Sequence, residues 1–207
     1  MKLRAKERAR TSVRLARGAD EVAAARALFL QYRQWLVDHR EVSAFFDESV
    51  LSTGLRHFDT EVATLPGEYG RPRGALILAW AKADPVGCGA LRRIGRDVAE
   101  IKRLYVRPEH RGAGFGRRIT RVLLNRARKL GYRRVVLDTL PGMTSAIGIY
   151  RSMGFVPIRA YWAHPYPDAL FFEYRLYRTS GARAPSSRRR TRGPSRGAPG
   201  ARSGSRP

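Results

Sequence analysis

The stretch LYVRPEHRGAGFGRR, from Leu104 to Arg118, is the most informative part of the sequence and lies where a strand pattern passes into a helical one. Within five residues it carries three glycines, Gly112, Gly114 and Gly116, which let the backbone approach a ligand closely and aim successive N–H groups at one point. A helix N-terminus adds unpaired donors and the positive end of the helix dipole, and both favour phosphate. The stretch therefore predicts a pyrophosphate site.

The charge around this loop supports the same interpretation, because Glu109 is the only acid between Ile101 and Leu137. A flexible turn is the alternative explanation of the glycines, since a glycine-rich loop alone is weak evidence. Two competing motifs do not fit. No Lys-Ser or Lys-Thr follows the loop as in a nucleotide P-loop, and the glycine spacing is not that of a Rossmann fold. The basic residues around the loop are Arg107, Arg111, Arg117, Arg118 and Arg121.

Upstream of the loop, the patterns predict one strand, two helices and an antiparallel meander of three strands. Asp20 is a suitable N-cap for the first helix, and Pro66-Gly67 is the expected end of the second. Residues 83–85 and 95–96 are the expected turns of the meander. The predicted strands span residues 12–17, 74–82, 86–94 and 97–106.

Downstream of the loop, helical spacing returns after Pro108 and ends before Gly131. The strand at 134–139 must run parallel to the strand before the loop if this helix is a crossover. A short helix and two strands, at 155–161 and 170–177, complete the chain. The predicted order is βααβββαβαββ, which is an α/β fold with a mixed central sheet.

The net charge suggests a nucleic-acid binder, but it is unevenly spread. The 207 residues carry 41 Lys and Arg against 17 Asp and Glu, a formal charge of +24. Residues 1–18 contribute +6, residues 19–178 contribute +10 and residues 179–207 contribute +8. The last segment contains only Arg, Ser, Gly, Pro, Ala and Thr, so it is predicted to be disordered. We expect a basic extension at 1–11, one domain at 12–178 and a tail after it.

The remaining composition excludes several classes of protein. No apolar run approaches the roughly 18 residues that span a bilayer, and the N-terminal residues lack the apolar segment of a secretory signal. The single cysteine, Cys88, cannot build a disulfide framework and is expected to be a small buried hydrophobic residue. The histidines have no metal-ligand spacing. We expect a cytoplasmic protein with no membrane partner and no metal.

Taken together, these segments resemble the GNAT superfamily of acetyl-coenzyme A-dependent N-acyltransferases. The pyrophosphate signature of that family is Arg or Gln, two residues, Gly, one residue, Gly or Ala, and Arg111, Gly114 and Gly116 match it. Three further stretches are typical of the family and occur in its order: EIKRLYVRPEHRG, LGYRRVVLDTL and AIGIYRSMGF. The element order also matches, so the resemblance covers roughly residues 12–178.

The resemblance implies that two parallel strands splay apart and bind acetyl-CoA, the acyl donor. The pantetheine arm would pair with Leu104–Val106, and a backbone N–H near Tyr105 or Val106 would polarise the thioester carbonyl. The amine would attack that carbonyl directly, with no covalent enzyme intermediate. The implied cofactor-binding residues are Leu104, Tyr105, Val106, Arg111, Gly112, Ala113, Gly114, Phe115, Gly116, Arg117 and Thr144.

Glu100 is the candidate general base. An alkyl amine has a pKa near 10.4, so removing its proton at pH 7 costs about 4.6 kcal/mol and a positioned base is useful. Glu100 lies 11 residues before Arg111, where several GNAT enzymes carry their base. The alternative is a solvated ion pair with Lys102, which lies two residues on and on the same face.

Tyr150 is the candidate general acid, because it matches the family tyrosine that protonates the leaving thiolate. The alternative is core packing, since Tyr150 falls on the apolar stripe of its helix. Thr144 stands where many relatives have an Asn that contacts the cofactor, and it could also cap the helix.

The acceptor is expected to be a small-molecule or peptide amine, bound by a monomer or homodimer. The loop residues Tyr161, Trp162, His164 and Tyr166 could shape its pocket or merely cover the end of the sheet. Asp138 could contact a cationic substrate or cap a strand. The competing function is a nucleic-acid or ribosome-associated binding protein, in which the arginine-rich termini attract a polyanion without sequence specificity.

Overall fold

The computed structural model describes residues 11–39, 48–164 and 167–176. The predicted tail, Tyr166 and most of the predicted N-terminal extension lie outside the described residues. The described elements follow the predicted order βααβββαβαββ. The predicted α/β class is therefore confirmed.

One seven-stranded mixed sheet forms the centre of the molecule, in the order β1-β2-β3-β4-β5-β7-β6. β4 and β5 pair in parallel, and every other neighbouring pair is antiparallel. The predicted meander and the predicted parallel crossover are both present. The strands are β1 (Thr11–Leu15), β2 (Ala75–Ala81), β3 (Asp84–Arg93), β4 (Val98–Val106), β5 (Arg134–Thr139), β6 (Val156–Ile158) and β7 (Leu170–Arg175).

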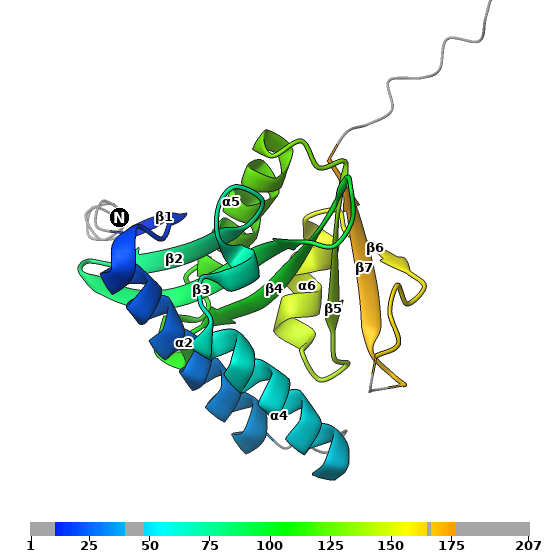
Figure 1. Ribbon diagram of the computed structural model, residues 1–207, viewed down its shortest axis with the longest axis horizontal. Helices are drawn as coiled ribbons and strands as arrows, with labels where there is room; N and C mark the ends of the chain where they lie inside the picture. The colour runs from blue at the N-terminus through cyan, green and yellow to red at the C-terminus, as the bar shows by residue number, and fades with distance from the viewer. Residues whose placement is uncertain (1–10, 40–47, 165–166, 177–207) are drawn as a thin grey trace, which may run out of the picture.

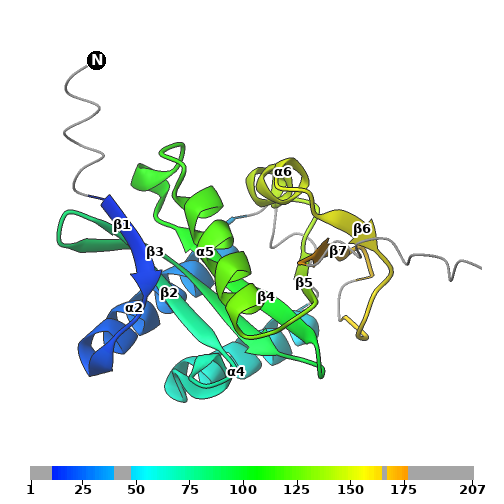
Figure 2. The same cartoon turned by 90° about the horizontal axis from the view of Figure 1, so that it is seen from above.

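Helices cover both faces of this sheet (Figures 1 and 2). One face carries α2 (Gly18–Asp38) and α4 (Glu48–Ala63), and the other carries α5 (Phe115–Lys129) and α6 (Thr144–Ser152). Two short 3₁₀ turns lie at Gly67–Tyr69 and Pro108–His110. The sheet is therefore the middle of three layers.

Each face has its own apolar core. Ile119 and Leu123 of α5 are fully buried against β2, β3 and β4. Phe29 of α2 packs edge-on against Phe58 of α4, with ring centroids 6.3 Å apart, on the opposite face. Cys88 is buried in this second core, and burial raises the pKa of its thiol, which confirms the expectation of a small hydrophobic residue.

The first helix begins earlier than the sequence predicts. α2 begins at Gly18, so Asp20 lies within its first turn and the predicted N-cap is wrong. The Glu21 carboxylate instead accepts the Arg17 backbone N–H at 2.6 Å and two hydrogen bonds from Arg14. A carboxylate in the first turn also complements the helix dipole.

Two strand boundaries also differ from the prediction. The turn predicted at residues 83–85 is shorter, because Asp84 and Pro85 belong to β3. The register between β2 and β3 shifts between Ala79 and Trp80, and such an irregularity is where a sheet tolerates proline. β6 spans only Val156–Ile158 rather than the predicted 155–161, which leaves Tyr161 on the loop that follows.

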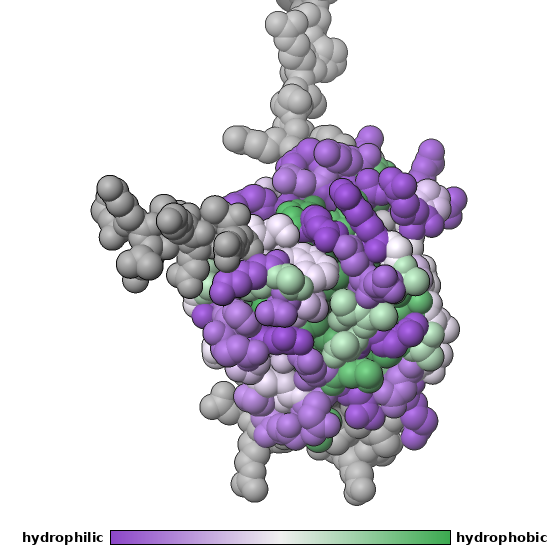
Figure 3. Space-filling model, turned by 90° about the vertical axis from the view of Figure 1, so that its left-hand side faces the viewer, coloured by the Kyte–Doolittle hydropathy of each residue, from purple (hydrophilic) through white to green (hydrophobic). Residues whose placement is uncertain are grey.

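The side of the molecule near β1 is mostly hydrophilic, with hydrophobic residues gathered in a central area (Figure 3). β1 is an edge strand of the sheet. Charged side chains on an edge discourage pairing with other chains, and Arg14 in β1 meets Glu21 at 2.6 Å. Among the described helices, none combines the length and the apolar character needed to cross a membrane.

Candidate active site

The parallel strands β4 and β5 pair over only three residues and then separate. Val98, Ala99 and Glu100 pair with residues 134–136, whereas the rest of β4 and β5 form no ladder with each other. β5 stays paired to β7 on its other side through Thr139. The two strands therefore diverge from Glu100 onward, as Figure 1 shows, and this leaves a gap in the ladder between them. The splayed pair implied by the family resemblance is present.

A β-bulge interrupts the regular pairing of β4 with β3 beside this gap. The register between β3 and β4 shifts between Cys88 and Ala90, and Arg103 has a φ of 57°, which is unusual for a residue with a side chain. Gly89 lies opposite the bulge, where a Cβ would come within 2.6 Å of Ile119 Cγ2. The bulge turns the segment that ends at Val106 relative to the rest of the strand.

The glycine loop joins the end of β4 to the start of α5. Gly112 and Gly114 have φ values of 77° and 82°, a left-handed conformation that favours glycine. Gly114 is the N-cap of α5 and no side chain caps the helix, so the amides of residues 115–117 have no intrahelical acceptor. A Cβ on Gly116 would lie 2.8 Å from Ile149 Cδ1, so α5 and α6 approach closely there.

The arginines of the loop reach in different directions. Arg111 Nε donates to the Val106 carbonyl at 3.1 Å, and the Arg111 guanidinium lies 4.7 Å from the ring centre of Trp35. Arg117 donates to Ser152 Oγ at 2.6 Å and lines a groove of about 320 Å³ between α5 and α6. Arg121 lines the same groove. The loop is thus flanked by positive charge, as predicted, although the groove lies outside the β4–β5 gap.

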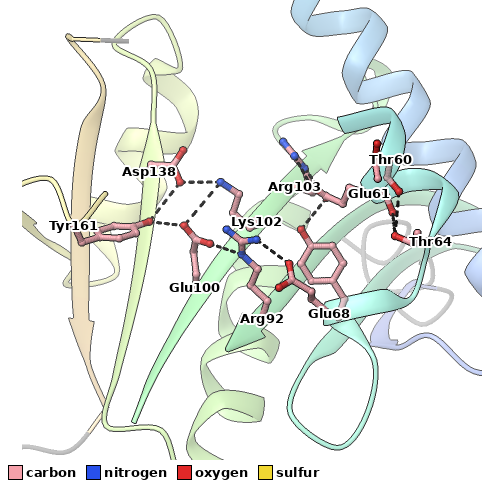
Figure 4. A network of polar contacts seen from close by, with 11 residues as sticks. Thr60, Glu61, Thr64, Glu68, Arg92, Glu100, Lys102, Arg103, Asp138 and Tyr161 are labelled. Atoms are coloured by element: carbon pink, nitrogen blue, oxygen red, sulfur yellow. Dashed lines mark hydrogen bonds and ion pairs between the residues drawn. The ribbon is translucent and has the colours of Figure 1, made fainter. Parts of the chain in front are cut away.

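Glu100 is held at the point where the strands part. Its side chain is 1% exposed, and its two oxygens accept hydrogen bonds at 2.6 Å from Arg92 Nε and Tyr161 Oη (Figure 4). Lys102 Nζ lies 3.9 Å away. The predicted proximity of Lys102 is confirmed, but the pair is buried rather than solvated.

Asp138, on β5, faces Glu100 across the same site. It accepts a hydrogen bond from Lys102 Nζ at 2.9 Å, and His164 Nε2 lies 3.4 Å from its other oxygen. Burial alone would raise the pKa of Asp138, but the bonds from His164 and Lys102 outweigh it and hold that pKa well below its usual range. Asp138 is therefore a carboxylate partner of Lys102 rather than a strand cap.

Tyr150 lies on α6 with its ring in the core. The ring centroid is 5.5 Å from that of Phe155 and 6.3 Å from that of Phe172. Burial raises the pKa of the phenol, and the negative charge of Asp138 raises it further. Within the described part of the chain its hydroxyl makes no hydrogen bond. The Tyr150 ring therefore packs in the core, while its hydroxyl has no hydrogen-bond partner among the described residues.

The model of the acetyltransferase (GNAT) family matches residues 42–155, which is more than half of the chain. The chain belongs to the GNAT family of acetyltransferases. An uncharacterized N-acetyltransferase of Schizosaccharomyces pombe is 31% identical over 137 residues, covering 65% of this chain and 84% of that protein. As a member of this family, the protein is an acyltransferase.

Solved structures establish the same fold for this GNAT enzyme. An acetyltransferase from Streptococcus agalactiae matches with a TM-score of 0.62 at 19% identity, over 80% of this chain and 98% of that one. YncA of Salmonella typhimurium, solved with its cofactor acetyl-CoA, matches with a TM-score of 0.56 at 19% identity, over 83% and 97% of the two chains.

The GNAT enzyme also contains site residues that the sequence did not single out. Arg92 bridges Glu100 and Glu68, and Arg103 donates two hydrogen bonds to Glu61 of α4 at 2.6 and 2.8 Å. The β3–β4 hairpin signals Arg92, because its register places Arg92 directly opposite Glu100. No local pattern signals the contact between Glu61 and Arg103, which joins residues 42 positions apart.

The remaining predicted site residues lie on β4, in the glycine loop, on α5 and on α6. Leu104 packs against the α5 core, Tyr105 is buried against Tyr32, and the Phe115 side chain is buried. Ala113 lies in the glycine loop. Thr144 is the first residue of α6 and does not cap it, since Met143 is the N-cap and no side-chain bond is made. The capping role considered for Thr144 is wrong.

Proposed function

We propose that this GNAT enzyme transfers an acetyl group from acetyl-CoA to the primary amine of a small molecule or peptide, by direct attack on the thioester. One observation carries the proposal: β4 beyond Glu100 has no partner on its β5 side, and the loop that follows it contains two left-handed glycines and ends at an uncapped helix N-terminus. This arrangement suits a ligand that has an extended amide-containing arm and a pyrophosphate.

The donor would lie along β4 and the loop. Its pantetheine arm would pair with the backbone of Leu104–Val106, and its pyrophosphate would accept hydrogen bonds from the amides of residues 112–117. Arg111 and Arg117 would add positive charge, and Thr144 would contact the arm from α6. The Tyr105 or Val106 N–H would donate to the thioester oxygen as negative charge develops on it.

Glu100 would remove the proton of the incoming ammonium. It stands where β4 and β5 separate, so a thioester held along Leu104–Val106 would lie further along the same strand. A positioned base contributes about 10²- to 10⁴-fold to such a reaction. The nitrogen would then attack the carbonyl carbon, forming the N–C bond as the C–S bond breaks.

Tyr150 would donate to the sulfur that leaves. Its raised pKa keeps the phenol neutral at pH 7, so it can donate a hydrogen bond to a thiolate whose own pKa is about 8.5. The absence of a competing bond to its hydroxyl among the described residues supports this role.

Release of free thiol from acetyl-CoA, measured across a panel of amines, tests the proposal. We expect wild type to release thiol with at least one amine, and Glu100→Gln to lower kcat by about 10²-fold or more without changing the Kd of acetyl-CoA. The control is His57→Gln, because the His57 side chain is exposed on α4. Failure of the folded wild type to bind acetyl-CoA would refute the proposal.

A further inference from the structure

The proposed reaction produces a proton that has to leave the site; this inference rests on the proposed function. An alkyl amine arrives as an ammonium ion at neutral pH, because its pKa is near 10.4. Both products, the amide and the CoA thiol, are neutral. The N–C bond forms and the C–S bond breaks, one ammonium proton replaces the proton that Tyr150 gives to the sulfur, and a second proton must reach solvent in every turnover.

Glu100 has no solvent route of its own for that proton. Its side chain is 1% exposed, and each oxygen is already engaged. Arg92 on one oxygen cannot carry a proton onward, because a guanidinium stays protonated in proteins. Tyr161 on the other oxygen can, because a hydroxyl donates one hydrogen bond while it accepts another.

Tyr161 connects Glu100 to a second carboxylate and then to a histidine. Its Oη lies 2.6 Å from Glu100 Oε1 and 3.4 Å from Asp138 Oδ1 (Figure 4). The other oxygen of Asp138 lies 3.4 Å from His164 Nε2. His164 in turn packs on Trp162, with ring centroids 4.5 Å apart, and Trp162 is 42% exposed. The contacts therefore run from the buried strand to the loop between β6 and β7.

We propose that Tyr161, Asp138 and His164 form the outlet through which the proton taken from the amine passes from Glu100 to solvent. The proton moves from Glu100 to the Tyr161 oxygen as the Tyr161 hydrogen moves to Asp138, so the phenol never ionises. Asp138 then passes the proton to His164 Nε2, which accepts it in the tautomer that has no hydrogen there, and the ring releases one proton to solvent. Histidine is the side chain best suited to release a proton near neutral pH.

The surrounding charges direct this transfer outward. Lys102 bonds to Asp138 at 2.9 Å and favours its anionic form, so Asp138 does not retain the proton. The titratable and charged groups that face the outlet are Glu100 and Lys102 from β4, Arg92 from β3, Asp138 from β5, and Tyr161 and His164 from the loop. Phe171 of β7 packs edge-on against Tyr161 and His164 and contributes no charge.

Dependence of the rate on buffer tests the outlet. With an amine that wild type accepts, in weak non-imidazole buffer at pH 7.5, we expect His164→Gln to lower kcat by about tenfold, less than loss of the base itself. Added imidazole should restore kcat in proportion to its concentration, because a small base can collect the proton from Asp138. Tyr161→Phe keeps the ring packed on Phe171 but lacks the hydroxyl that relays the proton. Its kcat should also be lowered, and imidazole should not restore that kcat. His57→Gln should match wild type throughout.

Several results would overturn the outlet. One is wild-type kcat for His164→Gln in weak buffer, and another is a loss that imidazole does not relieve while acetyl-CoA affinity and the melting temperature stay unchanged. Rescue of Tyr161→Phe by imidazole would also contradict it. These outcomes leave the proposed function intact, because wild type is still active. A folded wild type that binds no acetyl-CoA would overturn both.

Discussion

Replacing Arg92 by Met leaves the Glu100 carboxylate buried without its main cation. Arg92 Nε donates to Glu100 at 2.6 Å, the Arg92 side chain is 31% exposed and Glu100 is 1% exposed. Breaking a buried pair by removing one partner typically costs about 3–5 kcal/mol. Two partners remain, the Tyr161 hydroxyl and Lys102 at 3.9 Å, so we expect Arg92→Met to lower the free energy of unfolding by about 2–4 kcal/mol.

The double variant Arg92→Met/Glu100→Gln separates the buried charge from the lost packing. With no buried anion, its loss should fall to about 1–2 kcal/mol, the cost of incompletely satisfied polar groups. Urea unfolding measures these differences, and a loss of 3 kcal/mol corresponds to a drop in Tm of about 6–12 °C for a domain of this size. Arg14→Met, which breaks a pair of equal length but greater exposure, is the matched control and should cost much less. A double variant no more stable than Arg92→Met would show that the buried Glu100 charge does not cause the loss of stability.

Four further predictions concern the site and the C-terminal tail. Tyr150→Phe keeps the ring contacts and should lower kcat with little change in Tm, measured by thiol release; unchanged kcat would remove Tyr150 from the chemistry. Gly114→Ala forces a side chain into the left-handed region at a cost of about 1–2 kcal/mol, so we expect the Kd of acetyl-CoA to rise about tenfold by calorimetry, and an unchanged Kd would contradict the loop's role. The lowered pKa of Asp138 stabilises the fold above the unfolded-state value of about 3.9, and this contribution is lost as the pH falls toward the folded value. Asp138→Asn should therefore destabilise the protein at pH 7 and approach wild-type stability in acid; a constant difference would refute the assignment. Truncation after Arg178 should leave acetyl transfer intact and remove salt-dependent RNA binding, measured by titration at several salt concentrations, and retained RNA binding would place that activity elsewhere.

The order of elements is predictable from the sequence because its periods alternate cleanly. The strand at 134–139 and the helix that ends before Gly131 are found where the pattern places them. The ends of helices and strands are less predictable, because they depend on which side chain accepts a given hydrogen bond and on local shifts of strand register. Glu21 rather than Asp20 satisfies the start of α2, and a register shift keeps Pro85 inside β3.

The site was predictable only where one short segment builds it. The glycine loop and its uncapped helix come from consecutive residues, so their local conformations follow from residue type. The gap between the parallel strands cannot be predicted from residue type, because nothing in the local sequence marks Glu100 as the last paired residue. The contacts among Glu100, Asp138 and Tyr161 also join three separate segments, and only the folded sheet brings their side chains together.

The separation of β4 from β5 gives this protein two strand edges in its interior. Edges with unpaired N–H and C=O groups invite extended chains to pair with them, and proteins normally cover them. Any ligand that lies along Leu104–Val106 completes the sheet in the manner of an added strand. Such a ligand, present at 100 times its Kd, would stabilise the folded state by about 2.7 kcal/mol. The donor would thus protect the fold as well as supply the acyl group, and the empty enzyme would be the form most exposed to misassociation.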